Sequence, residues 1–372
     1  MKKILIINIL LFASALVYSQ NTISGIFSGL NNQQIKLIGF TGFDTYVIDS
    51  IRADEKGKFI MSYNKNDFGM GYLLSEDNAT FILVLENMDI ELHGINLKNS
   101  ESIKIITGEE NQFFEQYAKE HPRREQALSA WDYLEKIYAK DSLFAVQESP
   151  KQAIASEKQR IKTEDILFLA GLPQNFYINY YLPLRKLVSS VSTIAQYRTE
   201  EIPATIAALR NIVYTDPRLQ KSGLLANIIE SHFWLIENSG LSLDSMYIEM
   251  NVSIDYMIEN LLTNETKLNK ITEYLFKLLE KRSLFRASEY LALKLLNEQG
   301  CTINNEFAAQ LESYRAMKKG NIAPDFEFNK DIIAPGYETA ELPQKLSDIK
   351  SKYTVVVFGA SWCPQCPQEL SK

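Results

Sequence analysis

The sequence of 372 residues predicts a multidomain α+β fold, built from three parts that follow one another along the chain. Short β-branched and aromatic runs, punctuated by Gly, Asn and Asp, predict an antiparallel β-sandwich over residues 20–108. Apolar residues at helical spacing predict an α-helical domain over residues 109–318. An apolar run that ends in small residues predicts a strand covered on both faces, as in an α/β domain, within residues 319–372.

Residues 1–19 have the pattern of a signal peptide. Two lysines form a positive n-region, and the apolar run up to Val17 is too short for a membrane span. Cleavage between Ser19 and Gln20 leaves no cysteine at the junction, so lipoprotein processing is not indicated. We predict export to the periplasm or cell envelope, with no stable membrane span after cleavage. The alternative is an uncleaved anchor helix.

The composition is that of a globular protein, with 46% hydrophobic and 23% charged residues and a net charge of -7. A mildly acidic chain lacks the clustered Lys and Arg that nucleic acid requires, so we expect no nucleic-acid partner. The densest basic stretch is HPRREQ at residues 121–126. We interpret this short stretch as a solvated surface.

The β region contains six runs with strand character. Gly57, in ADEKGKF, is expected in a hairpin loop because glycine accepts a positive φ without cost. His93 stands alone, and we interpret it as a surface or loop histidine rather than a metal ligand. The six runs are TISGIFSGL, QQIKLIGF, TYVIDSIRA, GKFIMSYN, MGYLLSED and TFILVLENMDIELHG.

The helical region shows clear amphipathic periodicity, as in Leu268, Ile271 and Leu275. We interpret its aromatic residues as core, with a binding groove as the alternative, and His232 as a core or boundary residue. Five prolines are expected to separate the helices. These are Pro150, Pro173, Pro183, Pro203 and Pro217.

A linker around Gly320 leads into the last part of the chain. The segment APDFEF predicts a strand or hairpin, and LPQKLSDIKSKY predicts a short helical turn in which Ser347 or Asp348 forms a cap. The following run, Val355 to Phe358, is unbroken in its apolar character. It predicts a strand covered on both faces.

Cys363 and Cys366 form a C-x-x-C pair, and the remaining cysteine, Cys301, stands alone. Such a pair serves as half of a zinc site, as a structural disulfide or as a redox centre. Zinc needs further ligands, and the chain offers only distant histidines; c-type haem needs histidine where Pro367 stands. We therefore expect no metal and no cofactor. An exported protein enters an oxidising compartment, which allows the two cysteines to form a disulfide.

The residues around the pair favour redox chemistry. Small residues before Trp362 permit a tight turn, and a helix is predicted to begin at Cys363 or Pro364. Unpaired N–H groups at a helix N-terminus stabilise a thiolate, which predicts Cys363 as the exposed nucleophile. Cys366 lies about one turn further and is predicted as the resolving thiol. Pro364 and Gln365 help to set the reduction potential.

The last 50 residues resemble the start of a thioredoxin-like domain of the TlpA/ResA type. The resemblance implies an exported thiol–disulfide oxidoreductase that acts on protein thiols and disulfides in the cell envelope, with Cys363 attacking and Cys366 resolving. More weakly, the β region resembles an uncharacterised domain that often precedes such modules. The matching residues are Ala323, Pro324, Asp325, Phe326, Trp362, Cys363, Cys366 and Glu369.

The family domain continues into a cis-proline loop, two further strands and a last helix. No such residues follow Lys372 in this sequence. We therefore expect the thioredoxin-like domain of this chain to be incomplete, and the chain by itself to be inactive because half the wall of the active site is missing.

Two other functions stay open. A peroxiredoxin shares the APDF opening, but neither Cys363 nor Cys366 follows the Pro-x-x-x-Thr/Ser-x-x-Cys pattern of a peroxidatic cysteine. The second alternative is a non-catalytic periplasmic binding or docking module, formed by the β and helical regions that make up most of the chain.

Overall fold

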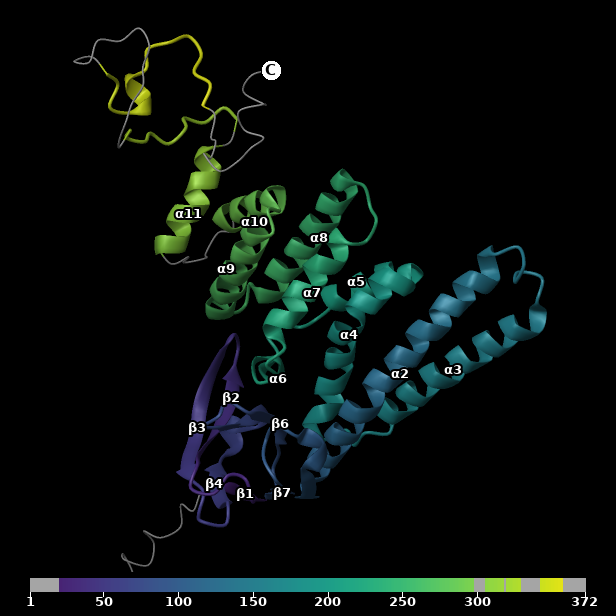
Figure 1. Cartoon of the computed structure of the whole chain (residues 1–372). Helices are drawn as coiled ribbons and strands as arrows, with labels where there is room; N and C mark the ends of the chain where they lie inside the picture. Colours follow the sequence, from purple (N-terminus) through teal and green to yellow (C-terminus); the bar gives the residue numbers. More distant parts are fainter. Residues whose placement is uncertain (1–19, 298–304, 318, 329–341, 357–372) are drawn as a thin grey trace, which may run out of the picture. The chain divides into compact units, whose positions relative to one another are not determined.

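The computed structural model describes residues 20–297, 305–317, 319–328 and 342–356 (Figure 1). These residues divide into two compact units, one ending at Leu291 and the other beginning at Ala292. The first unit has mixed α+β structure, with two four-stranded sheets followed by helices. The predicted signal peptide lies outside the described residues.

Eight strands form two sheets, in the orders β4-β1-β7-β8 and β3-β2-β5-β6. Their inner faces share one apolar core, to which Ile23, Leu37 and Leu83 contribute side chains with no exposed surface. All six predicted runs form strands, and the last one supplies two. The strands are β1 (Asn21–Phe27), β2 (Gln34–Thr41), β3 (Asp44–Arg52), β4 (Lys58–Tyr63), β5 (Gly69–Ser75), β6 (Thr80–Leu85), β7 (Ile90–Gly94) and β8 (Lys104–Thr107).

The predicted purely antiparallel sandwich is wrong at one pair of strands. β1 and β7 run parallel, with Ile23 opposite Ile90. A parallel pair needs a long crossover connection, and the chain supplies it because β2 to β6 intervene between the two strands. Gly57 has the predicted positive φ, at +74°, and a Cβ there would lie 1.8 Å from the Phe27 carbonyl oxygen.

Helices fill the rest of the first unit, and Figure 1 shows α2 and α3 side by side as a long hairpin. Leu268, Ile271 and Leu275 are buried as their spacing predicts. The helices are α2 (Glu109–Lys140), α3 (Glu148–Ala170), α4 (Tyr177–Tyr197), α5 (Ile202–Arg210), α6 (Pro217–Gln220), α7 (Leu225–Glu237), α8 (Leu243–Leu261), α9 (Glu265–Lys281) and α10 (Phe285–Asn297). The boundary between the two units falls inside α10.

Not every proline separates two helices. Pro173 lies between α3 and α4, and Pro203 and Pro217 lie in the first turns of α5 and α6, where proline is tolerated. Pro150 lies in the first turn of α3, but Pro183 lies inside α4, so its prediction as a break is wrong. Neighbouring buried residues such as Leu182 anchor α4 in the core, and this packing offsets the lost backbone hydrogen bond.

The predicted aromatic core is confirmed for the residues that pack between sheet and helices. Phe114 and Tyr117 of α2 and Tyr181 of α4 form one cluster with Met70 and Val84 of the sheet β3-β2-β5-β6. The rings of Phe114 and Tyr181 meet edge to face, with their centroids 6.0 Å apart. This cluster holds α2 against the end of β6.

The second unit contains α11 (Asn305–Ala316) and a pairing between its two following segments. Glu327 and Lys345 form a single antiparallel bridge. The predicted buried strand is wrong where the structure describes it, because Thr354, Val355 and Val356 are not in a strand and Val355 is 85% exposed. The physical reason is that no partner strand lies beside them within the described residues.

Candidate functional site

The predicted redox residues lie outside the part of the chain that the structure describes. They are Trp362, Cys363, Pro364, Gln365, Cys366 and Glu369. The structure does describe the segments that lead to them, including four residues of the family resemblance from Ala323 to Phe326. The first unit also contains two clusters of buried charged side chains that were not predicted, one around Asp165 and one around Glu110.

Asp325 of the APDF motif ties two segments of the chain together. Its Oδ1 accepts a hydrogen bond from the backbone N–H of Ser347 at 2.9 Å, and its Oδ2 accepts one from the Ser347 hydroxyl at 2.7 Å. These hydrogen bonds lower the pKa of the Asp325 carboxyl below its ordinary value. Asp325 therefore has a local structural role, which is to hold these two segments together.

Backbone hydrogen bonds extend this pairing. The N–H of Phe328 donates to the Gln344 carbonyl at 2.8 Å, and the N–H of Leu346 donates to the Phe326 carbonyl at 3.0 Å. The Asp348 carboxylate accepts from the N–H of Lys345 at 3.1 Å and so caps the short 3₁₀ turn η5 (Leu346–Asp348). The predicted short helical turn and its cap at Asp348 are confirmed. Of the predicted strand or hairpin, the described residues contain the single bridge between Glu327 and Lys345.

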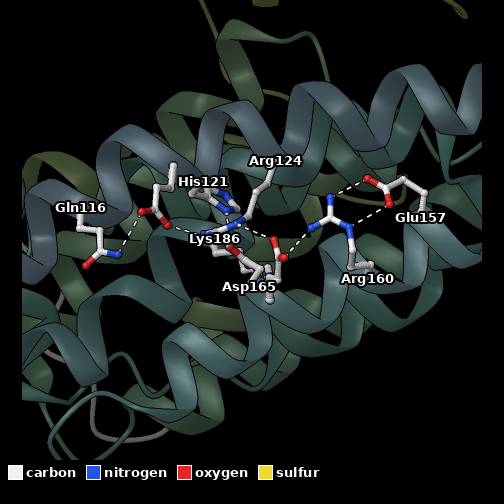
Figure 2. A network of polar contacts seen from close by, with 9 residues as sticks. Gln116, His121, Arg124, Glu157, Arg160, Asp165 and Lys186 are labelled. Carbon is white, nitrogen blue, oxygen red and sulfur yellow. Dashed lines mark hydrogen bonds and ion pairs between the residues drawn. The ribbon is translucent and has the colours of Figure 1, made fainter.

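A buried charged network joins α2, α3 and α4. Asp165 of α3 lies at its centre: its Oδ1 is 3.0 Å from Nδ1 of His121, and its Oδ2 is 2.5 Å from Nζ of Lys186. Figure 2 shows the network continuing on one side to Gln116 and on the other to Glu157. The side chains of His121 and Asp165 are 6% and 5% exposed.

The charges around Asp165 decide its ionisation. Burial raises its pKa, but the hydrogen bonds from His121 and Lys186 outweigh burial and hold the pKa below the ordinary value. A carboxylate surrounded by opposite charges serves to hold helices together. Within the described residues, no serine, threonine or cysteine hydroxyl or thiol bonds to His121, so this network lacks the nucleophile of a catalytic triad.

The interpretation of residues 121–126 as a solvated surface is wrong for three of the six. His121 is buried, Arg124 is 19% exposed at the side chain, and Glu125 binds Arg198, the residue that follows α4, at 2.8 Å. The missed signal is the spacing of His121 and Leu128, which lie seven residues apart on the helix face that also carries buried Tyr117.

Two acidic residues meet where the sandwich joins the helices. The Glu110 carboxylate accepts a hydrogen bond from the N–H of Ile178 at 3.2 Å, and the Glu86 carboxylate accepts one from the Asn111 amide at 2.9 Å. Burial raises the pKa of Glu110 to about 7 and also raises that of Glu86. The junction therefore contains a carboxyl group that changes its charge near neutral pH.

The two predicted isolated histidines lie where expected. His93 is partly exposed on β7, and its Nε2 lies 2.8 Å from Glu91. His232 is 1% exposed, and burial lowers its pKa to about 3. Among the described residues, no group of three His, Cys, Asp or Glu side chains is arranged to hold a metal ion. Nor is any helix of that part long and apolar enough to cross a membrane.

Comparison with known proteins gives no assignment: no protein family, no curated protein and no solved structure matches this chain.

Proposed function

We propose that this chain carries the cysteine pair of an exported thiol–disulfide oxidoreductase similar to the TlpA family, which acts on protein disulfides in the cell envelope. The observation that carries the proposal is the segment Trp362 to Cys366, WCPQC, which follows an apolar run after three small residues. The bonds between Asp325 and Ser347 support it, because they tie the APDF motif to the short turn that precedes that segment in the sequence.

The proposed reaction exchanges one disulfide for another. The thiolate of Cys363 attacks a sulfur of the partner disulfide, so that a mixed disulfide forms and the partner's other sulfur leaves as a thiolate that takes up a proton. The Cys366 thiolate then attacks the Cys363 sulfur. This step forms the Cys363–Cys366 disulfide and releases the second partner thiol, so the partner gains two electrons that the cysteine pair loses.

The two cysteines have different proposed roles, which a trapping experiment separates. Removal of the resolving thiol leaves the mixed disulfide without a route to release. In a Cys366→Ala variant, reduced and then mixed with insulin, we expect a covalent adduct between Cys363 and an insulin chain, measured by mass spectrometry.

The matched control is the double variant Cys363→Ser, Cys366→Ala, which retains Cys301. We expect no adduct with this control. An adduct of equal yield in both variants would assign the chemistry to Cys301, and the absence of an adduct from both would refute the proposed role of Cys363.

A further inference from the structure

A groove lies between the β-sandwich and α2, far in sequence from the cysteine pair. Its volume is about 480 Å³, which is within the range of about 300–1,000 Å³ found for ligand sites. Its apolar walls come from Phe81 and Ile82 of β6, Ile105 of β8 and Phe114 of α2. Ile82 is 45% exposed, so one wall of the groove is an apolar side chain open to solvent.

The groove runs along the edge of a sheet. β6 is the last strand in the order β3-β2-β5-β6, so its outward backbone groups have no partner strand. At Val84 a side chain takes the place of that strand: the Val84 N–H donates to Oδ1 of Asn111 at 2.7 Å, and Nδ2 of Asn111 donates to the Val84 carbonyl at 2.8 Å. Asn111 thus marks which backbone groups of β6 point outward.

Outward groups repeat every two residues along a strand. Because the backbone N–H and C=O of Val84 point outward, those of Ile82 and Thr80 do so as well. Both residues line the groove. No backbone or side-chain group in the described part of the chain binds these outward groups of Ile82. An added strand would satisfy them.

The groove is lined by three cations and two carboxylates, Glu101 and Glu115. Arg123 and Arg185 line it, and neither forms an ion pair with a carboxylate of the described residues. Arg185 instead lies over the ring of Phe114, 5.6 Å from its centroid. The other cation of the groove, Lys119, is bound to Glu115 at 2.6 Å. A ligand with a carboxylate would complement the two guanidinium groups.

We propose that an extended segment of a partner protein binds in this groove as an added strand along β6. Its backbone pairs with Thr80 and Ile82, one apolar side chain packs against Phe114, and an Asp or Glu two residues along the segment binds Arg185. Side chains two residues apart lie on the same face of a strand, so both reach the groove together. This inference is independent of the chemistry proposed for the cysteines.

The test uses capped pentapeptides of sequence Thr-Xaa-Thr-Glu-Thr, in which Xaa is Val, Leu, Ile or Phe, and fluorescence anisotropy with the full chain. We expect at least one peptide to bind, and to slow hydrogen exchange in residues 80–85. Replacement of the peptide Glu by Lys, or N-methylation of its central amides, is expected to weaken binding about tenfold or more.

The matched protein variants are Arg185→Gln and Arg160→Gln. Arg185→Gln is expected to weaken binding about tenfold, whereas Arg160→Gln, an exposed arginine of α3 outside the groove, leaves binding unchanged. No binding by any of the four peptides, or equal binding of the N-methylated form, would overturn the proposal. Tighter binding of a Gln peptide with a free C-terminal carboxylate would overturn the assignment to an internal acidic side chain.

Discussion

At the scale of single residues, the environment of Glu110 shifts the pKa of its carboxyl group into the neutral range. It is buried beside Glu86 and Glu109, which both repel its negative charge, and only backbone N–H groups stabilise the ionised form. Its pKa of about 7 lies above the ordinary value of 4.5. Ionisation therefore costs more in the folded chain than in the unfolded chain, and stability falls as pH rises from about 4.5 through 7.

The variant Glu110→Gln removes this ionisation and keeps an oxygen for the N–H of Ile178. We expect the variant to gain about 1–2 kcal/mol over wild type at pH 8 and to lose this advantage at pH 5. Urea unfolding at both pH values measures it. Glu55→Gln, at an exposed turn position away from Glu110, is the control. A stability difference between Glu110→Gln and wild type that is the same at pH 5 and pH 8 would contradict the assignment.

The buried network allows a second prediction at the residue scale. Asp165→Asn leaves the charge of Lys186 without its closest carboxylate and is expected to lower the free energy of unfolding by about 3–5 kcal/mol. Glu157→Gln, at the exposed end of the same network, is expected to change it by less than about 0.5 kcal/mol. Equal effects of the two substitutions in urea unfolding would show that Asp165 does not hold the helices together.

At the scale of elements, one amide side chain adds hydrogen bonds to the apolar packing of α2 against β6. Asn111 pairs with the backbone of Val84 as a strand would, and so ends the open edge of β6 at this residue. The length of edge that remains open is then set by where Asn111 lies in the first turn of α2. The position of α2 therefore determines both the groove and the pairing of Asn111 with Val84.

Asn111→Ala leaves two buried backbone groups of Val84 without partners and is expected to cost about 2–3 kcal/mol of stability. The amide of Val84 should also exchange with solvent faster, which hydrogen exchange measures. Gln112→Ala is the matched control, because Gln112 is exposed and its amide reaches the Ile105 carbonyl only at 3.4 Å. Exchange at Val84 that is equal in the two variants would refute the pairing.

Alternation and periodicity predict the elements well but not their partners. The period of two in β1 identifies a strand that buries Ile23 and Phe27, yet nothing in it indicates that β7 runs parallel to β1. Pro183 was expected to break a helix because proline is unfavourable in a helix interior. The helix continues through Pro183 because the tertiary packing of α4 outweighs this local preference.

At the scale of the whole molecule, charged residues were the hardest to predict. His121 and Asp165 lie 44 residues apart, and each alone has the character of a surface residue. Only the hairpin of α2 and α3 brings them together, and a single sequence contains no signal for which carboxylate faces which cation. The cysteine pair is the opposite case, since its motif is local and its prediction needs no tertiary contact.

The central claim is that Cys363 is an activated thiol, and its titration tests this most directly. In a Cys301→Ser, Cys366→Ala background Cys363 is the remaining cysteine, so the rate of alkylation by iodoacetamide against pH reports it alone. We expect an apparent pKa at least about one unit below the value of about 8.5 for free cysteine, and a return to that value in denaturant. An apparent pKa of about 8.5 in the folded chain would contradict the proposed function.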